Sequence, residues 1–159
     1  IDEKSIRHEN PEEMVLSIAQ AKTNALLPKI KEPAILITSD QIILFNGQIR
    51  EKPIDEKQAY EFLSTSHLHP VETIGAVVVT NTQTGKSVHG LQKGKVYFKS
   101  ISNEVMSEHI KNGSALRGAG GFIIDDPIFV PFIEKMEGSM DNVMGLDSEL
   151  TEKLIQQVL

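Results

Sequence analysis

The sequence predicts a single domain of the mixed α/β class. Segments with apolar residues at helical spacing alternate along the chain with short segments rich in β-branched residues. The chain has 159 residues, of which 40% are hydrophobic and 24% are charged, and these values are typical of a globular domain with its own core. We find no internal repeat or low-complexity segment, and we expect one domain over residues 1–159.

Four helices are predicted from capping residues and apolar periodicity. Each begins at an Asn, Asp or Ser that can cap a helix, and Pro11 stands at the first helical position of the first one. The predicted helices cover residues 11–28, 55–63, 102–112 and 148–159.

Short runs of β-branched and aromatic residues predict the strands. Ser39-Asp40 interrupts two of these runs, and Asn46-Gly47 is a strong signal for a tight hairpin turn. We therefore expect a strand, an acidic break and then a hairpin in this region. The predicted strands cover residues 34–38, 42–45, 48–50, 71–80, 87–91, 95–99 and 122–124, and the type of residues 128–136 stays open.

Charge and composition exclude several classes of function. The formal net charge is −6, so a nucleic-acid polymer is a poor partner for this chain. The sequence has no cysteine, which excludes disulfides, Cys-ligated zinc and thiol catalysis. This composition is compatible with a reducing cytosol, and we expect a cytoplasmic protein. No apolar run approaches the roughly 18 residues of a membrane span, so no membrane partner is expected.

Two lysines and one aspartate are the first candidates for a site. Asp40 ends a predicted strand, where open α/β sheets place ligands, and Lys52 returns toward it after the hairpin. A carboxylate beside an ammonium can bind a metal and a phosphate. The alternative is a strand-end cap and a solvated lysine. Lys22 borders the apolar face of the first helix, where the alternative is a lysine whose stem covers the core.

The segment Arg117-Gly118-Ala119-Gly120-Gly121 is a weaker candidate. Its glycines would let backbone N–H groups approach a phosphate or a base, although a tight packing loop explains the pattern equally well. The five histidines show no metal-binding spacing, and we expect structural or surface roles for them.

An ordered set of motifs along the chain resembles the Maf family, also called septum-formation-inhibitor-like proteins. The residues that carry this resemblance are Ile1-Asp2-Glu3, Ile18-Ala19-Gln20-Ala21-Lys22, Ser39-Asp40-Gln41-Ile42-Ile43, Glu51-Lys52-Pro53, His69-Pro70-Val71-Glu72-Thr73, Val96-Tyr97-Phe98, Ala119-Gly120-Gly121-Phe122 and the segment from Gly138 to Leu146. None of these motifs is specific alone, but their order over nearly the whole chain is. The resemblance is to a eukaryotic or plant-like member.

The resemblance implies a fold and an activity. The fold is a central mixed β-sheet flanked by helices, with two lobes around a cleft, as in inosine-triphosphate pyrophosphatases. The activity is hydrolysis of a nucleoside triphosphate to a monophosphate and pyrophosphate. The resemblance also implies a divalent metal, Mg²⁺ or Mn²⁺, and a homodimer. The alternative is a catalytically silent nucleotide-binding or regulatory protein.

The same resemblance implies roles for individual residues. Asp40 would be the catalytic carboxylate and a metal ligand, and Glu3 would be its acidic partner at the metal. Lys22 and Lys52 would hold the phosphates. Gln41 and Asp125 are candidates for base recognition, since many members have Thr and Gln at these positions.

Further departures from the family pattern bear on substrate and completeness. Thr65-Ser66 replace a usual Ser-Gly, and Asp147 replaces a Pro. Asp40-Gln41 resembles the branch that prefers 7-methyl-GTP, while Glu51-Lys52-Pro53 resembles the branch that prefers dTTP and UTP. The family begins with a strand and a Ser-x-Ser-x-x-Arg phosphate loop that would precede Ile1, so the resemblance implies a chain truncated at its N-terminus.

Overall fold

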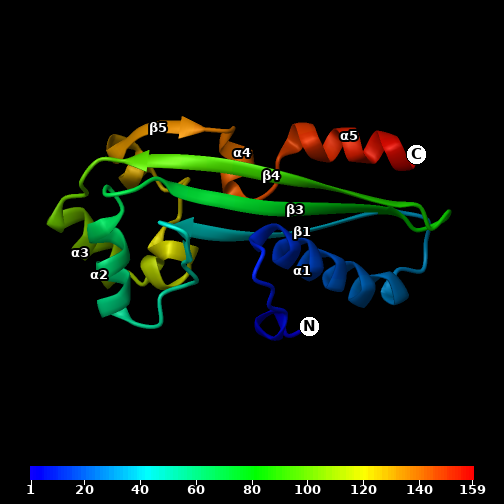
Figure 1. Ribbon diagram of the computed structural model, residues 1–159, viewed down its shortest axis with the longest axis horizontal. Helices are drawn as coiled ribbons and strands as arrows, with labels where there is room; N and C mark the ends of the chain where they lie inside the picture. Colours follow the sequence, from blue (N-terminus) through cyan, green and yellow to red (C-terminus); the bar gives the residue numbers. More distant parts are fainter. The chain divides into compact units, whose positions relative to one another are not determined.

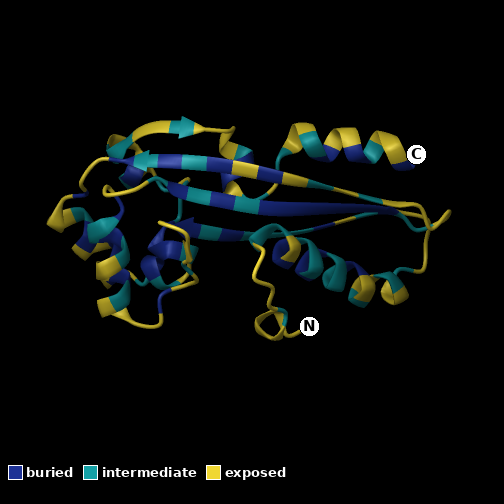
Figure 2. Cartoon of the chain, in the orientation of Figure 1, coloured by how far each residue is buried: buried dark blue, intermediate teal, exposed yellow.

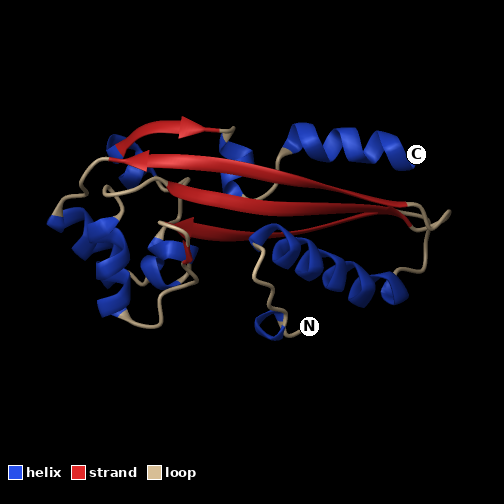
Figure 3. Cartoon of the chain, viewed as in Figure 1, coloured by secondary structure: helices blue, strands red, loops and turns tan.

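The structure is a computed structural model that describes all residues, Ile1–Leu159. Figure 1 labels its helices and strands, and Figure 3 separates them by type. The α-helices are α1 (Pro11–Leu26), α2 (Glu56–Thr65), α3 (Asn103–Lys111), α4 (Met140–Met144) and α5 (Ser148–Val158). The strands are β1 (Ile35–Phe45), β2 (Gln48–Ile49), β3 (Val71–Asn81), β4 (Ser87–Phe98) and β5 (Ile133–Glu137).

The strands form a five-stranded sheet in the order β2-β1-β3-β4-β5. Both outer pairs are antiparallel, with Leu44 opposite Ile49 and Val96 opposite Met136. The predicted α/β fold, with a central sheet and flanking helices, is confirmed.

Contacts divide the chain into two compact units. Unit 1 comprises Ile1–Gln41, Ile74–Lys93 and Gly145–Leu159, and unit 2 comprises Ile42–Thr73 and Gly94–Met144. Strands β1, β3 and β4 therefore contribute residues to both units. A single domain over residues 1–159 and a cleft between two lobes stay predictions.

In unit 1, helices α1 and α5 cover opposite faces of the strands (Figure 1). Val77 and Val79 of β3 pack with Leu154 and Val158 of α5. Alternation along a strand turns Thr38 of β1, which bonds to α1, away from the face that Ile35 presents to α5. Figure 2 shows the buried stripe of α5 and its exposed outer side.

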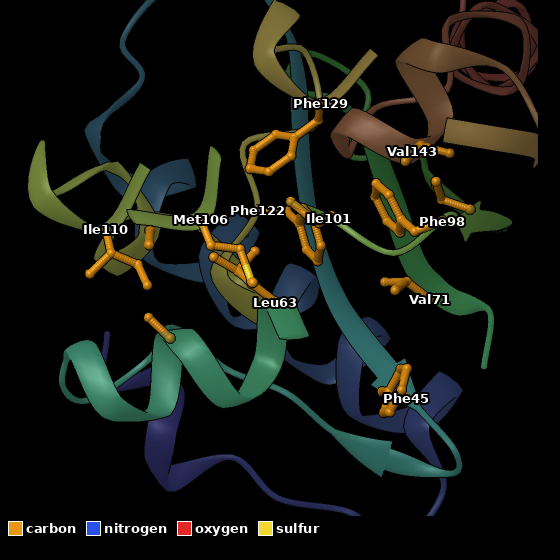
Figure 4. Packing of buried hydrophobic residues seen from close by; sticks show 13 residues of the cluster. Phe45, Leu63, Val71, Phe98, Ile101, Met106, Ile110, Phe122, Phe129 and Val143 are labelled. Carbon is orange, nitrogen blue, oxygen red and sulfur yellow. The ribbon is translucent and has the colours of Figure 1, made fainter. Parts of the chain in front are cut away.

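In unit 2, an aromatic cluster forms the centre of the core. Phe122 stacks on Phe98 with ring centroids 4.4 Å apart, and Phe129 meets Phe122 edge-on at 5.0 Å. The ring of His109 meets Phe129 edge-on at 4.6 Å. Figure 4 shows Phe98, Phe122 and Phe129 converging with aliphatic side chains from α2 and α3.

The predicted helices and the predicted hairpin turn are confirmed. Asn10 accepts hydrogen bonds from the N–H groups of Glu12 and Glu13, as its capping role requires. The turn residues Asn46 and Gly47 have φ values of 51° and 78°, the left-handed geometry that a two-residue hairpin demands. None of the helices combines the length and apolar character that a membrane crossing needs.

The predicted acidic break at Ser39-Asp40 is wrong, because β1 continues through both residues. The charge of Asp40 is neutralised by an ammonium group from α1, so the strand can carry a largely buried carboxylate without ending there. An apolar pattern read along the strand alone cannot detect this partner.

Two further strand predictions are also wrong. Residues 87–91 and 95–99 belong to one strand, β4, in which Gly94 is needed for packing: a Cβ there would lie 2.9 Å from Thr73 Oγ1 and from Val143 Cγ2. Residues 122–124 form no strand. They follow a 3-10 turn in which Gly120 and Gly121 have positive φ, and Phe122 instead enters the aromatic cluster.

Phe129→Ala should destabilise the protein by about 3–5 kcal/mol, because it removes a fully buried ring that the cluster cannot replace. The matched control is Val130→Ala, whose side chain is 59% exposed and whose loss should change stability by less than about 0.5 kcal/mol. Urea unfolding followed by circular dichroism measures both. Equal losses in the two variants would contradict the packing described for unit 2.

Candidate functional site

Unit 1 brings together three of the predicted site residues. Lys22 projects from α1, Asp40 from β1 and Glu3 from the 3-10 turn Glu3–Ser5. The Nζ atom of Lys22 lies 2.8 Å from Asp40 Oδ1 and 3.0 Å from Glu3 Oε1. The same ammonium donates a hydrogen bond to the carbonyl oxygen of Ser39 at 3.2 Å. Lys22 therefore joins both carboxylates and the backbone of β1.

Buried hydroxyl groups fix the position of Lys22 relative to Asp40. The Oγ1 atoms of Thr23 and Thr38 lie 2.6 Å apart. Thr38 Oγ1 also donates to the carbonyl of Ala19 at 2.9 Å. Thr23 adjoins Lys22 in the chain, and Thr38 lies two residues before Asp40. This bonding sets α1 against β1 at the level where the charged pair forms.

The three charged side chains differ in exposure. The side chain of Asp40 is 11% exposed, that of Lys22 is 27% exposed and that of Glu3 is 52% exposed. Burial raises the pKa of Asp40; the hydrogen bond and the positive charge of Lys22 oppose this rise, and the charge of Glu3 adds to it. Burial lowers the pKa of Lys22, but its bonds to Asp40 and Glu3 outweigh that effect and the net shift is upward. Lys22 is thus a cation at neutral pH.

This arrangement can perform acid–base chemistry on an anionic substrate. A carboxylate whose pKa is raised toward neutrality accepts a proton more readily than an ordinary aspartate does. The adjacent ammonium can stabilise negative charge that develops nearby, with less screening than at an exposed surface. Asp40 and Lys22 therefore supply a base and a cation at one position.

The donor set fits a divalent cation that is also held by a substrate. No group of three or more His, Asp or Glu side chains is arranged to bind a metal. Two carboxylates, Asp40 and Glu3, meet at Lys22. Mg²⁺ is commonly bound by one or two carboxylates together with substrate phosphates, and these residues match that pattern.

Gln41 follows Asp40 on β1 and belongs to the same unit. Its side chain is partly buried and lies against Gly145, so that a Cβ on Gly145 would stand 2.8 Å from Gln41 Oε1. The candidate base-recognition residue is therefore in contact with the segment that leads into α5.

Lys52 and Asp125 belong to unit 2, and both are exposed. Lys52 follows Glu51, whose carbonyl accepts a hydrogen bond from the N–H of Gly120 at 3.0 Å. The structure thus joins the turn that carries Lys52 to the glycine segment singled out in the sequence.

Sequence reasoning missed two features of these groups. The Thr23–Thr38 bond was not predicted, because a threonine pair between a helix and a strand leaves no periodic pattern. Gln92 on β4, which bonds to the segment beside Gln41, was also missed. The available signal was Asp147, which stands where the family resemblance places a Pro. Its N–H group donates to Gln92, and a Pro has no such group.

Comparison with known proteins finds one matching family model and several similar curated proteins. A family model described as Maf-like protein matches residues 1–158. The chain is 41% identical to a 7-methyl-GTP pyrophosphatase of Dictyostelium discoideum over 99% of this chain and 83% of the relative. It is 30% identical to a dTTP/UTP pyrophosphatase of Bdellovibrio bacteriovorus over 93% of this chain and 79% of the relative.

A third relative is a nucleoside triphosphate pyrophosphatase of Synechococcus, 28% identical over 99% of this chain and 79% of the relative. The fold is that of an α/β protein with a charged cluster on one strand and one helix. The chain belongs to the Maf family.

Asp40→Asn should leave the folded state at least as stable as the wild type at pH 8. The raised pKa means that ionised Asp40 is less favourable in the folded than in the unfolded chain. This cost is present above the folded pKa and disappears as the pH falls below the ordinary aspartate pKa, about 3.9. The stability gained by Asp40→Asn should therefore shrink toward acid pH.

Thermal unfolding of both proteins between pH 4 and pH 8 measures this difference. Asp55→Asn is the control, because Asn caps α2 as well as Asp does and stability should change little. A large loss of stability in Asp40→Asn at pH 8, greater than that of the control, would show that burial does not dominate at Asp40.

Proposed function

We propose that this chain hydrolyses a nucleoside triphosphate between its α- and β-phosphates and releases a nucleoside monophosphate and pyrophosphate. The observation that carries the proposal is the Lys22–Asp40–Glu3 cluster. This cluster belongs to a chain that is 41% identical to a 7-methyl-GTP pyrophosphatase. A base and a cation at one point match what phosphoanhydride hydrolysis needs.

In the proposed reaction, Asp40 accepts a proton from the attacking water. The oxygen of this water forms a bond to the α-phosphorus, and the bond from that phosphorus to the bridging oxygen breaks. The electron pair of the broken bond leaves with pyrophosphate. Lys22 orients Asp40 through the 2.8 Å contact and stabilises charge on the phosphates.

A divalent metal, Mg²⁺ or Mn²⁺, is part of the proposal. Asp40 and Glu3 would hold it together with phosphate oxygens of the substrate. When bound, such an ion neutralises phosphate charge and orients the reacting groups. Removal of divalent ions should therefore abolish turnover, while the charged cluster itself keeps its place through Lys22.

Two classes of nucleotide are candidates for the preferred substrate. One curated relative is a 7-methyl-GTP pyrophosphatase and another is a dTTP/UTP pyrophosphatase. The greater identity to the first favours a modified purine nucleotide, with Gln41 and Asp125 proposed as the residues that contact the base. A homodimer and a cytoplasmic location stay predictions of the sequence.

Asp40→Asn should reduce pyrophosphate release by at least about 10²-fold, the usual contribution of a positioned general base. The assay compares 7-methyl-GTP, dTTP and UTP with Mg²⁺ and with Mn²⁺. Asp55→Asn, which changes the exposed carboxylate that caps α2, is the matched control and should keep its activity. A variant at Asp40 that retains more than about a tenth of the rate, a loss below about 1.4 kcal/mol, would exclude Asp40 as the base.

Wild-type protein that binds nucleotides without releasing pyrophosphate would instead support a silent nucleotide-binding role. Calorimetry on the same samples separates this outcome from a protein that does not bind nucleotide at all.

Lys22→Ala and Lys52→Ala should each weaken triphosphate binding more than monophosphate binding, because a triphosphate carries more negative charge for them to neutralise. We expect the ratio of triphosphate affinity to monophosphate affinity to fall roughly tenfold in each variant, as for the loss of a hydrogen bond to a charged group. Lys153→Ala is the control, since Lys153 is exposed and pairs only with Glu149 along α5. Unchanged ratios at Lys22 and Lys52 would remove both lysines from the phosphate site.

A further inference from the structure

We propose that Gln92 is a positioning residue that sets nucleotide selectivity by holding residues 145–147 against Gln41. The inference rests on the proposed function, because it assigns Gln41 to contact with the base. Gln92 lies on β4 and belongs to none of the motifs singled out in the sequence.

Gln92 is a buried polar residue whose amide bonds at both ends. Its side chain is only 4% exposed. The Nε2 group donates to the carbonyl of Gly145 at 2.7 Å, and Oε1 accepts from the N–H of Asp147 at 2.8 Å. One side chain thus satisfies a backbone acceptor and a backbone donor two residues apart. A segment held at both groups cannot slide along β4 without breaking one bond.

Gly75 on β3 provides the space for this amide. A Cβ at Gly75 would lie 2.8 Å from Gln92 Nε2 and 2.9 Å from its Cγ. The same Cβ would lie 3.2 Å from the carbonyl oxygen of Asp40. The amide of Gln92 therefore lies across β3, close to the backbone that carries the proposed base.

Gly145 transmits this position to Gln41. A Cβ on Gly145 would stand 2.8 Å from Gln41 Oε1, so the Gln41 amide packs directly against the glycine backbone. The φ of Gly145 is 121°, a conformation that other residues rarely adopt. The carbonyl of this glycine is the group that Gln92 holds, so Gln92 reaches Gln41 through one residue.

Asp147 supplies the N–H group that makes the second bond. The Maf resemblance places Pro at this position, and Pro has no N–H to donate to Gln92. The φ of Asp147 is −68°, which a proline would also adopt. Asp147 in addition caps α5, because its carboxylate accepts from the N–H of Leu150 at 2.9 Å. Asp147, which departs from the family pattern, and the buried Gln92 are therefore the two partners of one hydrogen bond.

The consequence is a fixed orientation of the Gln41 amide. An amide presents both donors and an acceptor, which can pair with the polar edge of a base. Such a site rejects a base that leaves its polar groups unpaired, provided that the amide is held in place. Gln92 provides that restraint without touching the nucleotide, so it acts on the choice of base more than on bond cleavage.

The test measures kcat/KM for 7-methyl-GTP and for UTP in the wild type and in variants of Gln92 and Asp147. Gln92→Met keeps the length of the side chain and removes both hydrogen bonds. Asp147→Pro removes the N–H and the cap of α5, whereas Asp147→Ala removes the cap alone. We expect the ratio of kcat/KM for 7-methyl-GTP to kcat/KM for UTP to fall about 10-fold or more in Gln92→Met and in Asp147→Pro. The same ratio should stay unchanged in Asp147→Ala.

The change should appear mainly in KM, because Asp40 and Lys22 are intact in every variant. The double variant Gln92→Met/Asp147→Pro should show no greater loss of selectivity than Gln92→Met alone, since both changes break the same bond. Equal selectivity in the wild type and Gln92→Met, or equal effects of Asp147→Pro and Asp147→Ala, would overturn the proposal.

A second measurement separates this inference from the proposed function. Hydrogen exchange at the Asp147 amide needs no turnover, and Gln92→Met should speed it because the acceptor is gone. Unchanged exchange would refute the restraint even in an active enzyme. Faster exchange in a wild-type background that releases no pyrophosphate would instead uphold the restraint and refute the function.

Discussion

The contact of Lys22 with two carboxylates is the interaction on which the rest of the site depends. Asp40 is nearly buried in the middle of a strand, and burial alone would favour its neutral form. The ammonium of Lys22 lies 2.8 Å away and opposes that tendency. Without this cation, β1 would carry an uncompensated charge at this point. The pair thus allows a continuous strand to carry a largely buried carboxylate, and Glu3 joins the cluster from a separate segment of the chain.

Neighbouring residues of unit 1 hold Lys22 and Asp40 in contact. The Thr23–Thr38 bond fixes α1 on β1 from one side of the sheet. Gly75 on β3 packs closely against the backbone of Asp40 and the side chain of Gln92. Gln92 on β4 donates a hydrogen bond to Gly145 in the segment that leads into α5. Asp40 and Lys22 are therefore held by residues of α1 and of the neighbouring strands, which are regular elements of the fold.

The sequence predicts more of the fold than of the site. Caps such as Asn10 and turn residues such as Asn46-Gly47 act locally, so the helices and the hairpin could be found from short segments. The acidic break at Ser39-Asp40 was predicted wrongly, because the partner of Asp40 lies 18 residues away on another element. Asp40 and Lys22 were candidates from their positions at a predicted strand end and beside an apolar helix face, whereas their roles, and Glu3, came from the resemblance to a family. Gln92 was not found, because its role depends on backbone groups of Gly145 and Asp147 that no residue pattern reveals.

A carbon-13 NMR titration of the Asp40 carboxyl group, in the wild type and in Lys22→Met, tests the central claim most directly. Burial and Glu3 should place the pKa of Asp40 above the ordinary aspartate value of about 3.9 in the wild type. Removal of the Lys22 ammonium should raise the pKa of Asp40 further, because burial and the charge of Glu3, which both raise it, would then act without opposition. A wild-type pKa at or below the ordinary value, or the same pKa in both proteins, would contradict the account of Lys22 as the group that keeps Asp40 ionised.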